Sequence, residues 1–108
     1  MVVCLNSDRS VRRLKGPGRP VNPQEDRAAV LLGLGCVDRV EVFDEDTPCA
    51  VLERLRPAVF VKGGDYGGAD LPERKVLAQW GGRLVLVDLV EGRSTTHLLA
   101  RAVELASA

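Results

Sequence analysis

LVLVDLVEGRSTTHLL, residues 84–99, joins a valine-rich apolar run to the first turns of an amphipathic helix. The run over residues 84–87 is continuous rather than alternating, which is typical of a strand buried on both faces of a sheet. Gly92 ends the apolar pattern, and Ser94 is a favourable N-cap for a helix that we expect to reach about Ala106. A strand followed directly by a helix is the repeating unit of an α/β fold.

The start of this helix also predicts an anion-binding site. With Ser94 as N-cap, the amides of Thr95 and Thr96 lack intrahelical acceptors and lie at the positive end of the helix dipole. Arg93 adds a charge that can bind phosphate bidentately, and Gly92 leaves the backbone open to a ligand. An ordinary helix start has the same pattern, so these residues alone leave both interpretations open.

Three further valine-rich runs precede this stretch, at residues 2–5, 40–43 and 58–61. Helical patterns separate the four runs: one ends near Lys15, one follows Pro23, one begins with Thr47 as N-cap and Pro48 as first helical residue, and one covers residues 72–80. This order predicts an α/β fold with a Rossmann-like parallel sheet, right-handed crossovers and flanking helices. No repeat or linker interrupts it, so residues 1–108 are interpreted as one domain.

Composition restricts the possible functions. The chain has 108 residues, 45% of them hydrophobic, and a formal net charge of zero, which argues against a general binder of nucleic acid or membrane surfaces. Cys4, Cys36 and Cys49 form no Cys-x-x-Cys pair, and His97 is the single histidine, so neither a disulfide framework nor a metal site is predicted. We expect a cytoplasmic domain, and any anion site must be local.

Several cations follow the predicted strands, and the carboxyl ends of parallel strands meet at one edge of a sheet. The cations expected to gather there with the Ser94 helix start are Lys15, Arg19, Arg27 and Lys62. Each has a plainer interpretation: Lys15 and Arg19 as solubilising residues, and Arg27 as the partner of acids on its own helix. Asp65 is either a turn former or a carboxylate for ligand hydroxyls.

The remaining polar and aromatic residues receive no functional role from their pattern. A short helix carrying Arg9, Arg12 and Arg13 is expected to present them to solvent. Trp80 is expected to pack against neighbouring apolar groups.

Seven motifs occur in an order typical of one enzyme family: LNSD with Ser10-Val11 (5–11), LKG (14–16), RPVNP (19–23), DRA (26–28), FDEDTP (43–48), VKGGDY (61–66) and EGRSTT (91–96). The chain therefore resembles the adenylyltransferase domain of the bacterial bifunctional heptose 7-phosphate kinase and heptose 1-phosphate adenylyltransferase, in the cytidylyltransferase-like superfamily. The motifs cover most of the chain, so chance is a poor explanation.

The resemblance implies that a sugar 1-phosphate attacks the α-phosphate of ATP, releasing pyrophosphate and giving an ADP-sugar. ATP is then a substrate, usually bound with Mg²⁺, and no covalent enzyme intermediate is expected. By the same resemblance Lys15 and Arg27 are catalytic cations near the reacting phosphates. The implied nucleotide-binding residues are Gly92, Arg93, Ser94, Thr95 and Thr96. The implied substrate-binding residues are Asp8, Arg19, Lys62, Gly64 and Asp65.

The sequence departs from the family in one large respect. The family's domain opens with a central strand and a His-x-Gly-His segment, and residues 1–108 contain neither. The resemblance therefore implies a partial nucleotidyltransferase domain that is weak or inactive alone. A non-catalytic nucleotide-binding or assembly fragment is the alternative, and a generic flavodoxin-like binding domain is a third possibility that the EGRSTT and VKGGDY motifs disfavour.

The expected partners are a nucleotide and a sugar phosphate, with no nucleic acid and no membrane. In the family's sheet the central strand lies between the counterparts of residues 2–5 and 58–61. Without it, both runs present unpaired, apolar edges. Direct pairing of the two runs, a register shift or dimerisation would each satisfy the edges, and we expect a homo-oligomer.

Overall fold

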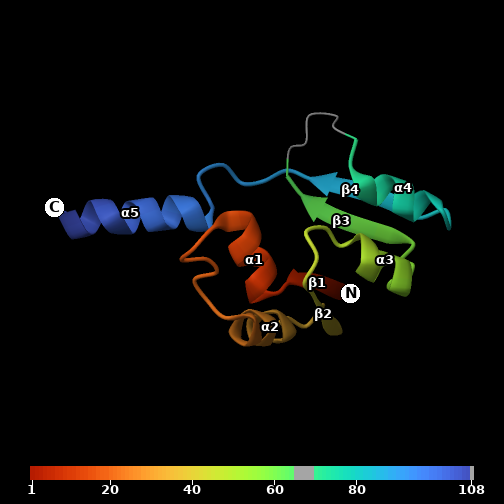
Figure 1. The fold of residues 1–108 in the computed structure, drawn as a ribbon, viewed down its shortest axis with the longest axis horizontal. Coiled ribbons are helices and arrows are strands. Elements are labelled where there is room, and N and C mark those ends of the chain that lie inside the picture. Colours follow the sequence, from red (N-terminus) through yellow and green to blue (C-terminus); the bar gives the residue numbers. More distant parts are fainter. Residues whose placement is uncertain (65–69, 108) are drawn as a thin grey trace.

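The computed structural model describes residues 1–64 and 70–107. Its helices and strands alternate along the chain as expected for an α/β domain (Figure 1). In order they are β1 (Val2–Asn6), α1 (Asp8–Lys15), α2 (Gln24–Leu32), β2 (Arg39–Phe43), α3 (Cys49–Leu55), β3 (Val59–Gly63), α4 (Pro72–Ala78), β4 (Arg83–Val87) and α5 (Thr95–Ser107). Each strand begins within one residue of the start of its predicted run and ends within two residues of the end of that run.

The strands form two separate parallel sheets instead of one. β1 pairs with β2 from Val2↔Arg39 to Asn6↔Phe43, and β3 pairs with β4 from Val59↔Arg83 to Gly63↔Val87. Within the described residues β1 and β3 are not hydrogen-bonded to each other, so a continuous sheet and direct pairing of these two runs are both wrong. The break between the sheets therefore lies between β1 and β3. The resemblance places the family's central strand between these two strands, and that central strand remains a prediction.

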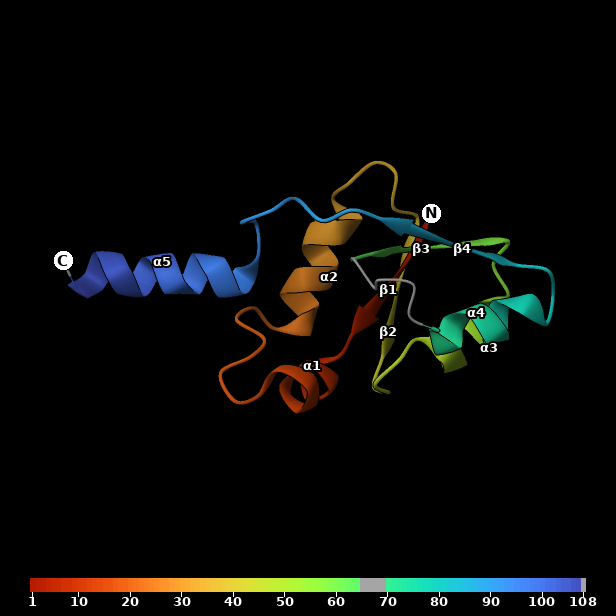
Figure 2. The same cartoon turned by 90° about the horizontal axis from the view of Figure 1, so that it is seen from above.

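Each sheet carries its own helices. α1 and α2 contact β1, and α2 also contacts β2, whereas α4 packs on β4 and against α3 (Figures 1 and 2). The most deeply buried apolar side chains belong to the α3–α4 layer: Val51 and Leu52 of α3, and Leu77 of α4, which is 0% exposed. The main apolar core therefore stabilises the β3–β4 half of the molecule.

The turn between α4 and β4 explains why glycines occupy positions 81 and 82. Gly81 has a φ of 76°, which favours glycine. A side chain at Gly82 would lie 2.9 Å from the Pro57 carbonyl oxygen, so only glycine fits there. The Trp80 indole Nε1 donates to the same carbonyl at 2.8 Å, and the Arg56 guanidinium lies 5.1 Å from the Trp80 ring centre. Trp80 therefore has a structural role in this turn, through the Pro57 carbonyl and the Arg56 guanidinium.

α5 projects away from the rest of the molecule (Figures 1 and 2). The radius of gyration is 15.6 Å, whereas a compact domain of this length has roughly 13 Å. Leu98, Val103 and Leu105 are each at least 66% exposed, so the apolar stripe of α5 covers no core among the described residues. The core packing expected for this helix is therefore not observed.

Helix starts agree with the sequence at α1 and differ by one residue at α3. The Ser7 hydroxyl accepts the Ser10 amide at 3.1 Å and caps α1. α3 begins at Cys49 with Pro48 as N-cap, so the prediction that Thr47 caps this helix is wrong. Proline at the cap has no side-chain acceptor, and none caps α3.

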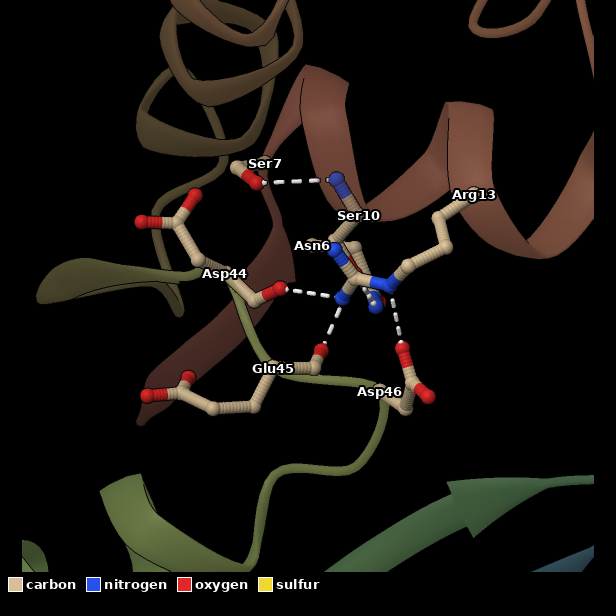
Figure 3. A network of polar contacts seen from close by, with 7 residues as sticks. All are labelled: Asn6, Ser7, Ser10, Arg13, Asp44, Glu45 and Asp46. Atoms are coloured by element: carbon tan, nitrogen blue, oxygen red, sulfur yellow. Dashed lines mark hydrogen bonds and ion pairs between the residues drawn. The ribbon is translucent and has the colours of Figure 1, made fainter.

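A polar network joins α1 to the segment after β2 (Figure 3). The Ser10 hydroxyl accepts from Asn6 at 3.0 Å and donates to the Glu45 carbonyl at 2.9 Å. Arg13 donates through Nε to Asp46 at 2.6 Å and through Nη2 to the Asp44 carbonyl. Arg13 is exposed, as expected of this face of α1. Its two acceptors come from the segment after Phe43, which lies beside α1. The network fixes the direction of α1, which carries Lys15 at its last position.

Replacing Ser7 with alanine tests this network. The hydrogen bond from Ser7, together with the Arg9 and Arg13 charges, lowers the pKa of Asp44 against a raising effect of desolvation. A depressed carboxylate pKa stabilises the fold above the unfolded-state pKa and loses that effect as pH falls through the folded value. Ser7→Ala should lower the free energy of unfolding at pH 7 by about 0.5–2 kcal/mol through the lost cap, plus the lost Asp44 interaction.

Urea unfolding of wild type and Ser7→Ala at pH 7 and pH 2.5 measures both parts. We expect the difference between the two proteins to be smaller at the lower pH, where a larger fraction of Asp44 is protonated. An equal difference in the free energy of unfolding at both pH values would show that Ser7 does not stabilise the fold through the Asp44 charge. Ser107→Ala, at the exposed end of α5, is the matched control and should change neither value.

Candidate functional site

A cavity of about 380 Å³ lies between the end of α1, the segment before α2 and the start of α5. The structure brings together here three of the predicted cations with the predicted helix start, although α1 and α5 are about eighty residues apart in the sequence. The predicted residues that line it are Lys15, Arg19, Arg27, Ser94, Thr95 and Thr96. This cavity is the candidate phosphate site.

The start of α5 has the geometry expected of an anion-binding helix N-terminus. The Ser94 hydroxyl accepts the His97 amide at 3.0 Å, which confirms Ser94 as a capping residue. Among the described residues, neither the Thr95 nor the Thr96 amide donates a hydrogen bond. Arg19 Nη2 donates to the Thr96 hydroxyl at 3.1 Å and holds a guanidinium beside these amides. Unused amides and a cation therefore meet at one point.

The cations of the cavity differ in how their charge is balanced. Arg27 donates to Asp8 Oδ1 at 2.9 Å and to the Asn22 carbonyl at 3.0 Å, so the expectation that it pairs with acids of its own helix is wrong. Within the described part of the chain, Lys15 and Arg19 have no carboxylate within 4 Å. The net positive charge of the cavity therefore comes from Lys15 and Arg19, while Asp8 positions Arg27.

Gly92 and Arg93 lie beside the cavity without lining it. Gly92 has a φ of 74°, and nothing lies within 4 Å of the position that a side chain would occupy. The Arg93 amide donates to the Val90 carbonyl at 3.2 Å, closing the turn before α5. Glycine is therefore required by the backbone at position 92, and the Arg93 side chain is a neighbour of the cavity.

Lys62 and Gly64 lie elsewhere, at the carboxyl end of β3. Lys62 does not line the 380 Å³ cavity, so the expectation that it joins Lys15, Arg19 and Arg27 is wrong: its Nζ lies 2.8 Å from Oε1 of Glu73. The Gly64 amide donates to the Val87 carbonyl at 3.0 Å, and its φ of 138° favours glycine. Asp65, the last predicted substrate-binding residue, lies outside the described residues.

A second and larger cavity, of about 720 Å³, separates the two sheets. Residues of β1 and β3 form its walls, and Asn6, Asp46, Lys62 and Gly63 line it near the carboxyl ends of the strands. Val59 and Val61 are 46% and 55% exposed, so the β3 wall is apolar and uncovered. We call this cavity the inter-sheet cleft.

Sequence reasoning missed Glu73. This residue occupies the first turn of α4, is 1% exposed and is the partner of Lys62. Acidic residues are common in the first turn of any helix, so the sequence contained no signal that this one is buried.

The described residues contain no group of three or more histidine, cysteine, aspartate or glutamate side chains that could hold a metal ion. In the same part of the chain, the longest helices are too short or too polar to cross a lipid bilayer.

Comparison with known proteins identifies the family. The sequence profile described as Cytidylyltransferase-like matches residues 1–91, which include the four strands and every residue that lines the inter-sheet cleft. The chain belongs to the cytidylyltransferase-like family. This confirms the resemblance and the expected α/β class of the fold.

Relatives from several bacteria carry the name Bifunctional protein HldE. The chain is 64% identical over 104 residues to the protein of Streptomyces coelicolor, covering 96% of this chain and 22% of the relative. It is 48% identical to that of Syntrophotalea carbinolica, covering 96% and 21%. It is 56% identical to that of Mesorhizobium japonicum, covering 94% and 20%. The chain therefore spans about a fifth of the length of these curated relatives.

Proposed function

We propose that this chain supplies the phosphate-binding part of a sugar-phosphate adenylyltransferase, which converts ATP and a sugar 1-phosphate into an ADP-sugar and pyrophosphate. The observation that carries the proposal is the joint position of Lys15, Arg19 and the free Thr95 and Thr96 amides around one cavity. The motifs that resemble heptose 1-phosphate adenylyltransferase, and the relatives named Bifunctional protein HldE, support a heptose as the sugar.

The reaction makes few chemical demands on side chains. Phosphoryl and nucleotidyl transfers need the two reactants in line and their charge neutralised, and no protein nucleophile is required. In our proposal the α5 amides, with the Thr96 hydroxyl, bind the nucleotide phosphates. Lys15 and Arg19 neutralise charge, and Arg27, oriented by Asp8, donates hydrogen bonds to a reacting phosphate. Arg93, beside the cavity, adds a third guanidinium.

A Mg²⁺ ion fits this donor set only as a companion of the nucleotide. Magnesium is commonly held by substrate phosphates and waters with few protein ligands, and the cavity walls carry cations and hydroxyls rather than a cluster of carboxylates. When bound, the ion would screen phosphate charge. Every protein contact proposed above is to phosphate.

Calorimetric titration of ADP into wild type and three variants tests the site. Because Arg19 contacts Thr96 inside the cavity, Arg19→Gln should weaken binding by about 1.5–3 kcal/mol, the usual effect of one charge-assisted contact. Arg93→Ala should weaken it less, since Arg93 lies at the rim. Arg12→Ala removes an exposed charge from α1 outside the cavity and is the matched control.

Equal ADP affinities for wild type and Arg19→Gln would remove the cavity from the nucleotide site. Equal weakening in Arg19→Gln and Arg12→Ala would indicate only a general effect of net charge. Repeating the titrations at two salt concentrations separates these results, because a long-range charge effect is screened by salt and a direct contact is screened less.

A further inference from the structure

We propose that Glu73 is a positioning residue, which holds the Lys62 ammonium at the inter-sheet cleft, near the carboxyl end of β3. This inference rests on the proposed function, because it assigns Lys62 a fixed place in the site. It concerns a residue outside every motif of the resemblance.

The contact is direct and largely shielded from water. Glu73 Oε1 accepts from Lys62 Nζ at 2.8 Å, with Glu73 1% exposed and the Lys62 side chain 28% exposed. Glu73 Oε2 is also buried, and no described residue donates a hydrogen bond to it. Lys62 is therefore the cation that balances this carboxylate among the described residues, and moving Lys62 away would leave a buried charge uncompensated.

Packing alone does not account for the pair. α4 is already anchored by Leu71 and Leu77, which are 8% and 0% exposed. Replacing a buried ion pair with apolar side chains is often neutral or stabilising, so the fold does not need a charge at this point. What the pair does provide is an ammonium with one location, because a lysine side chain is otherwise flexible.

That location suits a substrate contact. Lys62 is the last residue but one of β3, beside Gly63, and it lines the cleft together with Asn6 and Asp46 of the β1–β2 half. Ligands of parallel α/β sheets bind at the carboxyl ends of the strands. The Glu73 carboxylate also balances the Lys62 charge, whereas Lys15 and Arg19 have no such partner among the described residues. Lys62 therefore contributes to the orientation of a bound group more than to the attraction of anions from solution.

The first arm of the test needs no ligand. Lysine acetylation by acetic anhydride, quantified by mass spectrometry, compares Lys62 with Lys75, which lies on α4 and is 80% exposed. We expect Lys62 to react about tenfold more slowly than Lys75 in wild type and to react faster in Glu73→Leu than in wild type, since the leucine removes the carboxylate that holds the ammonium. Equal rates for Lys62 and Lys75 in wild type would overturn the proposal.

The second arm measures ligand affinity and stability together. Glu73→Leu should weaken binding of sugar 1-phosphate about tenfold, and Glu73→Gln, which keeps a hydrogen-bond acceptor, should weaken it less. The midpoint of urea unfolding should not fall in Lys62→Met/Glu73→Leu, in which both charges of the pair are removed together. Glu53→Leu, an exposed acid on α3, is the control for the loss of a negative charge. The double variant Lys62→Met/Glu73→Leu places only apolar side chains at the two positions. It should fold as well as wild type and should bind sugar 1-phosphate no more tightly than Glu73→Leu.

Unchanged sugar 1-phosphate affinity in Glu73→Leu would overturn the positioning role and leave the pair a structural contact. If wild type binds neither ADP nor sugar 1-phosphate, the proposed function fails. The acetylation rates then decide alone whether Glu73 fixes Lys62.

Discussion

Residues 1–108 alone should release pyrophosphate from ATP and heptose 1-phosphate roughly 10²–10³ times more slowly than the same residues preceded by a strand and a His-x-Gly-His segment. The physical reason is that the reaction needs donors aimed at charge that develops in the transition state. His97 is the single histidine of the sequence, and it lies on the exposed first turns of α5. In the proposed site Lys15, Arg19 and Arg27 hold substrate phosphates, but binding the ground and transition states equally well does not raise the chemical rate.

A coupled pyrophosphate assay with Mg²⁺ measures both polypeptides at saturating substrates. His97→Gln in residues 1–108 is the matched control and should leave the residual rate unchanged. Comparable turnover by the two polypeptides would show that residues 1–108 contain a complete catalytic arrangement. A fall in rate with His97→Gln would identify that arrangement as one that uses α5.

We also expect residues 1–108 to associate at micromolar concentrations through the walls of the inter-sheet cleft. Within the described residues, β1 and β3 each pair on one side, and their other edges carry unpaired backbone groups beside Val59 and Val61. Apolar strand edges of this kind template pairing with another chain. Val61→Lys should shift the protein towards monomer, because a charged side chain on an edge opposes strand addition.

Sedimentation equilibrium over a hundredfold range of concentration measures this association. Val30→Lys introduces the same charge on α2, at a residue that is 73% exposed and outside the cleft. It should leave the average mass unchanged. A clean monomer for wild type at the highest concentration would contradict the prediction.

Local structure was largely predictable from the sequence, and sheet continuity was not. The valine-rich runs mark β1 to β4 because continuous apolar residues require burial on both faces. Ser7 and Ser94 mark helix starts because their hydroxyls accept amides that have no other partner. Whether β1 meets β3 depends on the space between two elements more than fifty residues apart, and no local pattern encodes that distance.

Part of the candidate site was likewise predictable from the sequence, and part was not. Lys15, Arg19 and the start of α5 were predicted to meet, because a parallel arrangement places the loops after its strands at one edge. The pairing of each remaining cation was not predictable. Asp8 and Glu73 look like ordinary first-turn acids, and only the three-dimensional arrangement places them against Arg27 and Lys62.

The inter-sheet cleft has a consequence for how the molecule opens. The β1–β2 half and the β3–β4 half each form their own strand ladder. The backbone passes from the first half to the second in the segment 44–48, and after β4 it returns to the α1–α2 side at the start of α5. Strand hydrogen bonds in one half do not depend on those in the other. The two halves can therefore behave as separate cooperative units, with amide protons of β3 and β4, next to the deeper apolar core, exchanging more slowly than those of β1 and β2.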